Sequence, residues 1–352
     1  MESPTAIELA LPGLEGSGVT HEPATQHFIL RGPQKRLMVF SGRSHPQLAA
    51  SIAEKLGVEL GDVELKTFVN DETYCRYLES IRGADVFLVQ TGCPPVDKNL
   101  MELLLMAQAA KLGSAKRITA VIPWYPYARQ DRKAKPREPI SARLVADMLQ
   151  LAGVDRVLTM DLHAGQIQGF FTIPVDHMTA VQLFATHFRD LGLTGEGVVA
   201  VAPDAGRAKQ AVRFAEMIDA SFAIMHKMRP EHERAEITEV TGRVKGKIAI
   251  VGDDVTMTGG TLIAGAQALK EQGATEVNVF VTHALFSEAA LEEIGKSEID
   301  RIVVTDTVPI DLRNRPDNLT VLSVSGLLAE AIMNVFADDS VSAIFGGENQ
   351  LF

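Results

Sequence analysis

Short apolar runs rich in β-branched residues alternate along this chain with longer stretches in which apolar residues recur at helical spacing. The first run, 37–40, is followed by 46–56, where Leu48, Ile52 and Leu56 share one helical face. The alternation returns at 86–90 with 100–112 and at 118–124 with 142–151, and further strand-like runs lie at 156–160, 198–202, 247–251, 277–281 and 302–305. Strands that alternate with helices in this way favour parallel sheets covered by helices on both faces.

The predicted βα units are too many for one sheet of ordinary width. The pattern therefore favours an α/β protein with two doubly wound parallel-sheet domains. We expect an N-terminal domain over 35–178 and a C-terminal domain over 179–346. Residues 1–34 contain several prolines and glycines and no sustained periodicity, which predicts a flexible N-terminal extension.

Two predicted connections are long and charged. One spans 125–140 and contains three arginines and two lysines, and the other spans 227–239. Loops of this length without secondary structure are commonly functional, so both are candidates for ligand binding.

Composition excludes several classes of protein. With 352 residues, of which 46% are hydrophobic and 22% charged, the chain is neither disordered nor fibrous. Its 34 Lys and Arg against 45 Asp and Glu give a net charge of −11, which argues against nucleic-acid binding. The apolar stretch at 100–110 is interrupted by Glu102 and Gln108, and no export signal is recognisable, so we expect no membrane span. Cys75 and Cys93 are the only cysteines, which favours a reducing cytoplasm.

The strongest chemical signal is the segment 248–261, IAIVGDDVTMTGGT, in which an apolar run leads into two carboxylates and a small-residue loop before a helical stretch. At the carboxyl edge of a parallel sheet such a loop faces bound ligands. Its backbone N–H groups suit a phosphate, and Asp253 and Asp254 suit a vicinal diol or a cation. The segment therefore predicts a sugar-phosphate site, and the alternative is a glycine-rich turn with capping threonines and solvated aspartates.

This segment resembles the phosphoribosyl-binding signature shared by type I phosphoribosyltransferases and ribose-phosphate pyrophosphokinases. Further segments are similar to ribose-phosphate pyrophosphokinases specifically: YPYARQDR at 125–132, REPIS at 137–141, DLHAGQIQGFF at 161–171, PDAG at 203–206, and shorter matches at 44–46, 68–72, 99–103 and 340–342. The likeness extends from about residue 38 to about residue 345.

The resemblance implies two α/β domains of the type I phosphoribosyltransferase kind and a defined reaction. The diphosphoryl group of Mg-ATP would be transferred to the anomeric hydroxyl of ribose 5-phosphate, giving 5-phosphoribosyl 1-diphosphate and AMP for nucleotide biosynthesis. By family analogy the active unit is a homo-oligomer, commonly a hexamer. Ribose 5-phosphate would bind to Arg229, Asp253, Asp254, Met257, Thr258, Gly259, Gly260 and Thr261.

The family likeness also identifies candidate ATP-binding residues. Phe68 would stack on adenine, and Arg129 with Gln130 would bind the nucleotide; the remaining candidates are Asn70, Asp71, Glu72 and Asp131. Guanidinium and amide groups suit phosphates and base edges, although a solvated charged loop would have the same composition.

The cofactor implied by the resemblance is Mg²⁺, bound by His163 and Asp204. A lone histidine is more often a satisfied polar residue than a ligand, and only the family likeness reverses that reading. Mg²⁺ keeps several waters, so we expect sparse protein coordination, and His163 acting through a water is one form of it.

Lys227 and Arg229 are the candidate catalytic residues. Cations on a mobile loop can stabilise charge that develops as a phosphoryl group moves. The residues alone would also fit a solvated hairpin, and the resemblance implies the catalytic role.

Three positions depart from the family pattern. Met257 stands where an aspartate is usual, Asp71 where glycine is common, and Gly165 at a variable position of the His163 motif. The loss of a carboxylate at Met257 favours one alternative, a catalytically silent homologue that co-assembles with an active synthetase. A phosphoribosyltransferase is a second alternative, but it would leave the Arg129 loop unexplained.

Overall fold

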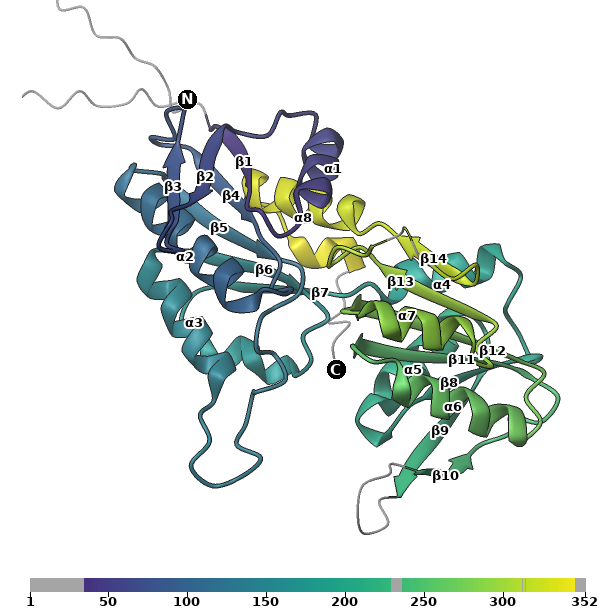
Figure 1. Cartoon of the computed structure of the whole chain (residues 1–352). Helices are drawn as coiled ribbons and strands as arrows, with labels where there is room; N and C mark the ends of the chain where they lie inside the picture. Colours follow the sequence, from purple (N-terminus) through teal and green to yellow (C-terminus); the bar gives the residue numbers. More distant parts are fainter. Residues whose placement is uncertain (1–34, 229–235, 312, 314, 346–352) are drawn as a thin grey trace, which may run out of the picture. The chain divides into compact units, whose positions relative to one another are not determined.

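The computed structural model describes residues 35–228, 236–311, 313 and 315–345 (Figure 1). The predicted N-terminal extension, 1–34, lies outside the described residues. Two parallel sheets and a two-stranded hairpin contain the strands of the described part of the chain.

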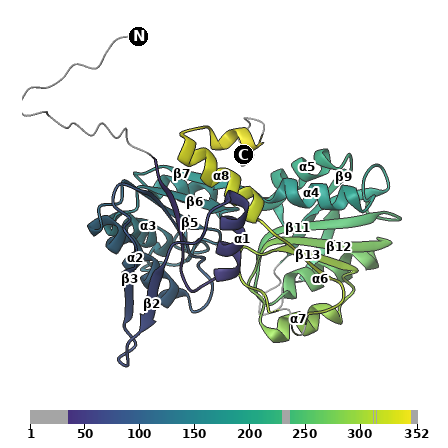
Figure 2. The ribbon, with the colours of Figure 1, turned by 90° about the horizontal axis from the view of Figure 1, so that it is seen from above.

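The first sheet consists of five parallel strands in the order β1-β4-β5-β6-β7. Their bounds are β1 Leu37–Ser41, β4 Asp85–Val89, β5 Arg117–Ile122, β6 Arg156–Met160 and β7 Val175–Met178. The connections contain helices α1 Pro46–Leu56, α2 Val96–Leu112 and α3 Ser141–Ala152, and the 3₁₀ turn η1 Gly165–Phe170. A separate antiparallel hairpin, β2 Val63–Thr67 with β3 Thr73–Tyr77, projects from this half of the chain (Figure 2).

Alternating side chains of β1 pack on opposite faces of the first sheet. Val39 packs in one hydrophobic cluster with α1, whereas Phe40 packs in another with α2 and α3. Strands buried on both faces read as continuous apolar runs in the sequence, which is why the sequence predicted them well.

The second sheet has seven strands in the order β10-β9-β8-β11-β12-β13-β14, and all pairs are parallel except β10 with β9. Its strands are β8 Val198–Ala202, β9 Ser221–Met228, β10 Glu236–Thr241, β11 Ile248–Thr256, β12 Glu276–Ala284, β13 Arg301–Thr305 and β14 Leu319–Leu322. The helical segments of this half are α4 Val181–Asp190, η2 Ala205–Arg207, α5 Ala208–Met217, α6 Gly260–Glu271, α7 Glu288–Gly295, α8 Ser325–Ala337 and η3 Val341–Phe345.

Helices cover both faces of the second sheet, as expected for a doubly wound fold. One face packs on α6 and α7 and the other on α4 and α5. The last long helix, α8, packs beside α1 of the first half (Figures 1 and 2). The predicted boundary at 178/179 lies between the two sheets, because β7 ends at Met178 and β8 begins at Val198. As a domain boundary it stays a prediction. No helix in the described ranges is long and apolar enough to cross a membrane.

Two differences from the sequence prediction affect the candidate site. The strand predicted at 247–251 continues to Thr256, so Asp253 and Asp254 lie inside β11 and not after it. The predicted charged loop at 227–239 is strand at both of its described ends, in β9 and β10. Polar residues disfavour strand assignment, and both corrections depend on strand pairing, of β11 with β12 and of β9 with β10. The 125–140 connection contains no helix or strand, as predicted.

Candidate active site

The carboxyl ends of four strands deliver the polar side chains that the sequence singled out. Arg129 follows β5, His163 follows β6, Asp204 follows β8, and Asp253 with Asp254 lies in the last part of β11. Ligands of open parallel sheets bind at this edge, so the placement is suitable for a binding site.

Asp253 and Asp254 are adjacent in a strand and therefore point to opposite faces of the sheet. The side chain of Asp254 is 2% exposed, whereas that of Asp253 is 19% exposed. The preceding residue is Gly252, where a Cβ atom would lie 2.2 Å from the ring of Phe280. The packing of Phe280 thus requires glycine at the entry to the acidic pair.

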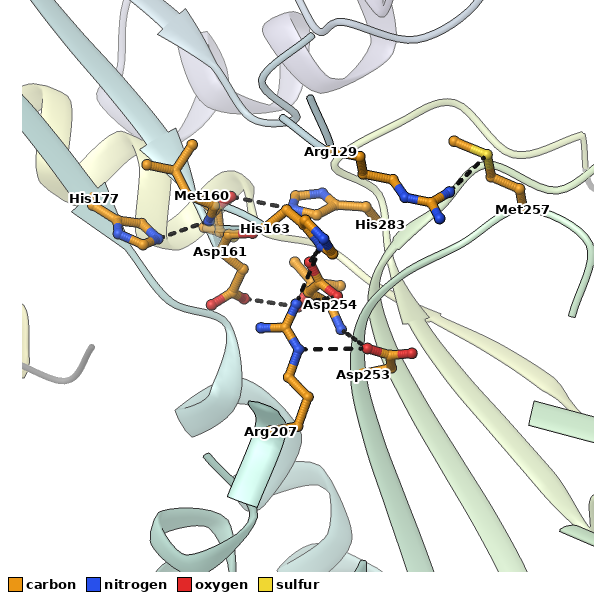
Figure 3. A network of polar contacts seen from close by, with 12 residues as sticks. Arg129, Met160, Asp161, His163, His177, Arg207, Asp253, Asp254, Met257 and His283 are labelled. Atoms are coloured by element: carbon orange, nitrogen blue, oxygen red, sulfur yellow. Dashed lines mark hydrogen bonds and ion pairs between the residues drawn. The ribbon is translucent and has the colours of Figure 1, made fainter. Parts of the chain in front are cut away.

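Arg207, which the sequence analysis missed, is the cation that compensates this acidic pair. Its guanidinium forms an ion pair with Asp254 and approaches Asp253 with Nε 3.7 Å from Oδ1 (Figure 3). The available signal was its position directly after the 203–206 motif. Its partners on β11 could not be read from that position.

His163 contacts the same carboxylate from the other half of the chain. Its Nδ1 lies 2.7 Å from Asp254 Oδ2 (Figure 3). An ionised carboxylate only accepts hydrogen bonds, so Nδ1 carries the proton and Nε2 is the ring nitrogen left for another partner. Arg207 Nη2 lies 3.4 Å from the same Nδ1. Because both nitrogens then carry hydrogens, Asp254 supplies the attraction that holds the three groups together.

The two aspartates have opposite pKa shifts. Burial and the neighbouring Asp254 carboxylate raise the pKa of Asp253 to about 7. Burial also acts to raise the pKa of Asp254, but the hydrogen bond from His163 and the charge of Arg207 outweigh it and lower that pKa to about 2. At neutral pH Asp254 is therefore ionised, while Asp253 exchanges a proton readily.

Arg129 reaches the small-residue loop that follows β11. Its Nη1 lies 3.6 Å from the sulfur of Met257 (Figure 3). Both side chains are exposed, Met257 to 41%. The predicted nucleotide loop and the predicted sugar-phosphate loop therefore meet at this contact.

The loop between β11 and α6 has the geometry of an anion site. Gly259 adopts φ 72° at the N-terminus of α6, and a Cβ there would lie 2.9 Å from Ile294. The N–H groups of Gly259 and Gly260 make long hydrogen bonds, 3.3 Å to the hydroxyl of Thr256 and 3.4 Å to that of Thr258. Backbone donors at a helix N-terminus suit a phosphate.

Gln130 and Asp131 are held by neighbouring side chains. The hydroxyl of Ser141 donates to Gln130 Oε1 at 2.6 Å, and Gln166 Nε2 donates to Asp131 Oδ2 at 2.8 Å. Asp131 also lines a cavity of about 380 Å³ beside His163 and Arg207.

The predicted adenine-binding residues lie apart from this cluster, at the tip of the β2–β3 hairpin. Phe68 is 46% exposed and contacts Tyr74 edge to face, with ring centroids 5.6 Å apart. Asp71 adopts φ 68°, a conformation that favours glycine, and forms an ion pair with Lys98 at 2.9 Å. Among the described residues, no hydrogen bond or ion pair joins the turn 68–72 to the segment 253–257.

The candidate catalytic residues are only partly covered by the structure. Lys227 belongs to β9, where its backbone pairs with Ile237 of β10. Arg229 lies outside the described residues. The sequence prediction that Lys227 lies in a loop is therefore wrong, because pairing with β10 extends the strand through it.

His163 and Asp204, the predicted partners of Mg²⁺, follow β6 and β8, and within the described residues no hydrogen bond or ion pair joins the two side chains. Asp204 is exposed, and its Oδ1 accepts a hydrogen bond from the Gly206 N–H at 2.8 Å. In the part of the chain that the structure describes, no group of three or more His, Cys, Asp or Glu side chains is arranged to hold a metal ion. Binding of Mg²⁺ by His163 and Asp204 therefore stays a prediction.

Comparisons with known proteins identify the family of the chain. The profile of the N-terminal domain of ribose phosphate pyrophosphokinase matches residues 37–153, and that of the phosphoribosyl synthetase-associated domain matches 229–346. The chain is 48% identical over 307 residues to the ribose-phosphate pyrophosphokinase of Fusobacterium nucleatum, covering 87% of this chain and 97% of that protein. It is 49% identical over 309 residues to that of Caldanaerobacter subterraneus, covering 88% and 98%.

A solved structure agrees with these relatives. The phosphoribosylpyrophosphate synthetase from Mycobacterium smegmatis superposes with a TM-score of 0.80 at 44% identity, and the match covers 86% of this chain and 100% of that one. The expected fold of two parallel α/β sheets is confirmed. The chain belongs to the ribose-phosphate pyrophosphokinase family.

Proposed function

We propose that this chain transfers the diphosphoryl group of ATP to ribose 5-phosphate, giving 5-phosphoribosyl 1-diphosphate and AMP. The anomeric hydroxyl oxygen attacks the β-phosphorus and forms the new O–P bond. The bond from the β-phosphorus to the α,β-bridging oxygen breaks, and AMP leaves with that oxygen and its electron pair. The hydroxyl proton passes to solvent or to a nearby base. The observation that carries the proposal is the contact between Arg129 and Met257, which brings the predicted nucleotide loop against the predicted sugar-phosphate loop.

Ribose 5-phosphate is proposed to bind along the end of β11. Asp253 is the more exposed acid and accepts hydrogen bonds from the sugar hydroxyls. Asp254 also accepts from the sugar once the guanidinium of Arg207 releases one of the Asp254 carboxylate oxygens. The 5-phosphate lies at the N-terminus of α6, against backbone N–H groups and the hydroxyls of the loop; the residues concerned are Met257, Thr258, Gly259, Gly260 and Thr261. Arg229 adds a cation to this site.

ATP is proposed to lie between two subunits. Arg129, Gln130 and Asp131 bind it from one chain. Phe68 of a second chain stacks on adenine, and Asn70, Asp71 and Glu72 contact the nucleotide. This division is supported by the exposure of Phe68 at the hairpin tip. The functional unit is then a homo-oligomer, with a hexamer as the specific expectation.

The cofactor is proposed to be Mg²⁺, with His163 and Asp204 as its protein partners. When bound with ATP, the ion neutralises part of the polyphosphate charge. Lys227 and Arg229 act as the catalytic cations and stabilise the charge that develops on the transferred group. The proposed location is the cytoplasm, because the chain contains only two cysteines, Cys75 and Cys93.

The test is incubation of the purified protein with ATP, ribose 5-phosphate, Mg²⁺ and phosphate, with AMP and phosphoribosyl diphosphate measured against a control without the sugar. The proposal predicts sugar-dependent AMP and an equal amount of phosphoribosyl diphosphate.

Met257 supports one alternative function, a silent regulatory homologue that co-assembles with an active synthetase. That alternative predicts no product from the isolated protein although ATP still binds. A gain of activity on mixing with an active synthetase subunit would then favour it.

A further inference from the structure

Asp161 is a strained residue that leads the chain from β6 to His163. It follows Met160, the last residue of β6, and has φ 36° in the left-handed region, which is unfavourable for a residue with a Cβ. Its side chain is buried. Such a conformation persists only where the surrounding structure fixes it, so the contacts of Asp161 are informative.

The carboxylate of Asp161 is held by a hydroxyl from the other sheet. Asp161 Oδ2 accepts a hydrogen bond from Thr282 Oγ1 at 2.7 Å and a second from the Ala180 N–H at 3.0 Å. Thr282 is buried in β12. A hydrogen bond to a buried charged group is among the stronger kinds, so this contact ties the end of β6 to β12.

The next residue of β12, His283, holds the backbone at the same point. Its Nε2 lies 3.1 Å from the carbonyl oxygen of Met160 and 3.2 Å from that of Asp161 (Figure 3). Carbonyl oxygens only accept, so Nε2 carries the proton and donates to both. Nδ1 lies 2.9 Å from Thr307 Oγ1, and burial lowers the pKa of His283, so the neutral ring accepts there.

The strand that provides these contacts lies beside the strand of the acidic pair. In the β11–β12 register, Val281 pairs with Asp253 and His283 pairs with Val255. Thr282 and His283 thus form hydrogen bonds with Asp161 from β12, the strand adjacent to the β11 strand that contains Asp254. Two residues beyond Asp161, the ring of His163 meets Asp254 at 2.7 Å.

We propose that Thr282 and His283 are positioning residues that clamp Asp161 and thereby hold His163 against Asp254 with its Nε2 available to the nucleotide site. The inference rests on the proposed role of His163 in that site. Neither clamp residue touches substrate; they act through the strained backbone of Asp161. Without the clamp, the chain after β6 can relax out of the left-handed conformation, and the ring of His163 moves relative to Asp254.

The test compares conservative and disruptive substitutions. His283→Gln keeps an amide donor near the position of Nε2, and Thr282→Ser keeps the hydroxyl; both are expected to retain turnover within about threefold. His283→Phe and Thr282→Val remove the donors and are expected to lower kcat by roughly 10–100-fold, because small misplacements of a catalytic group have large effects. The matched control is Thr159→Val, since the hydroxyl of Thr159 is buried in β6 without a hydrogen-bond partner among the described residues.

A double-mutant cycle separates positioning from a general loss of structure. If His283 acts through His163, then His283→Phe lowers kcat little further in a His163→Ala background. If His163→Ala lowers kcat and the losses in kcat of the two single variants add in the double variant, the positioning role of Thr282 and His283 is refuted. The proposed function is then unaffected. Normal turnover of His163→Ala would instead refute the proposed role of His163 in the nucleotide site. The clamp would then make no catalytic contribution through His163.

A measurement without turnover completes the test. In ¹⁵N-histidine spectra of the full-length protein, the His163 signal, assigned by its loss in His163→Ala, should report a protonated Nδ1. The inference predicts that His283→Phe shifts this signal while Thr159→Val does not. A His163 signal that is unchanged in a folded His283→Phe protein would refute the inference.

Discussion

The guanidinium of Arg129 lies 3.6 Å from the sulfur of Met257, at the position where a ribose-phosphate pyrophosphokinase usually carries an aspartate. An aspartate there would form an ion pair with Arg129, whereas a thioether is only a weak acceptor. The two loops therefore meet through a weaker contact than an aspartate at position 257 would allow.

Restoring the carboxylate tests the significance of this departure. Met257→Asp is expected to strengthen ribose 5-phosphate binding by roughly three- to tenfold, because a charge-assisted hydrogen bond to Arg129 fixes both loops. Calorimetric titration with ribose 5-phosphate measures the change, and Met257→Leu is the control of similar size without a polar atom. Unchanged or weaker affinity in Met257→Asp would contradict the prediction.

Removing Arg207 is expected to destabilise the substrate-free protein. Asp254 is 2% exposed, and Arg207→Ala leaves it buried with His163 as its remaining strong partner. Breaking a buried pair from one side typically costs about 3–5 kcal/mol of unfolding free energy, and partial exposure of Arg207 favours the lower end. Chemical denaturation at pH 7 measures the loss, and Lys209→Ala, which removes an exposed lysine of α5, is the comparison for the loss of one positive charge.

The pH dependence of this loss has a defined sign. The pKa of Asp254 is lowered in the folded protein from 3.8 to about 2, so its contribution to stability is present above pH 4 and is lost as the pH falls toward 2. The difference in unfolding free energy between wild type and Arg207→Ala should therefore become smaller as the pH falls. A difference that stays constant down to the lowest pH at which both proteins fold would count against the Arg207–Asp254 pair as its source.

Asp253 should give the opposite pH dependence. Its pKa is raised from 3.8 to about 7, so the folded state holds the proton more tightly and stability falls as the pH rises between those values. Asp253→Asn should reduce this decline when unfolding is compared at pH 5 and pH 8. Sugar hydroxyls donate better to an ionised carboxylate, so the affinity for ribose 5-phosphate should rise more steeply through pH 7 in wild type than in the variant.

Continuous apolar runs allowed much of this fold to be predicted from sequence. The bounds expected for β6 and β8 agree with the structure because both strands are buried on their two faces. The end of β11 was placed too early because Gly252, Asp253 and Asp254 disfavour a strand by themselves. Only pairing with β12 extends the strand through them.

Individual residues of the candidate site could be predicted from the sequence, but the contacts between them could not. The motifs identified His163 and Asp254, yet nothing in their spacing along the sequence indicates that they contact each other across two sheets. His283 carries no motif signal, and Arg207 has only its position directly after the 203–206 motif. Their roles follow from packing between segments far apart in the sequence, which a single sequence does not encode in any local pattern.

Asp71 provides a test of the hairpin turn. It has φ 68°, so Asp71→Gly removes backbone strain but also removes the ion pair with Lys98, and the two effects should nearly cancel. Asp71→Ala loses the pair and keeps the strain, so it should be less stable than Asp71→Gly. The KM for ATP should stay within about twofold for Asp71→Gly and rise for Asp71→Ala, because local order at the turn governs nucleotide placement. Equal KM values for the two variants would show that the backbone conformation at 71 is unimportant for ATP.

The last prediction concerns Lys227, which lies in β9 two residues before Arg229. An ammonium that stabilises charge only in the transition state should affect turnover far more than substrate binding. Lys227→Ala is therefore expected to lower kcat by about 10² or more, with the affinities for ATP and ribose 5-phosphate nearly unchanged. Lys245→Ala, an exposed lysine after β10, controls for loss of one positive charge in the same region. Near-normal turnover in Lys227→Ala, with the protein folded, would remove Lys227 from the mechanism and leave Arg229 as the cation to test.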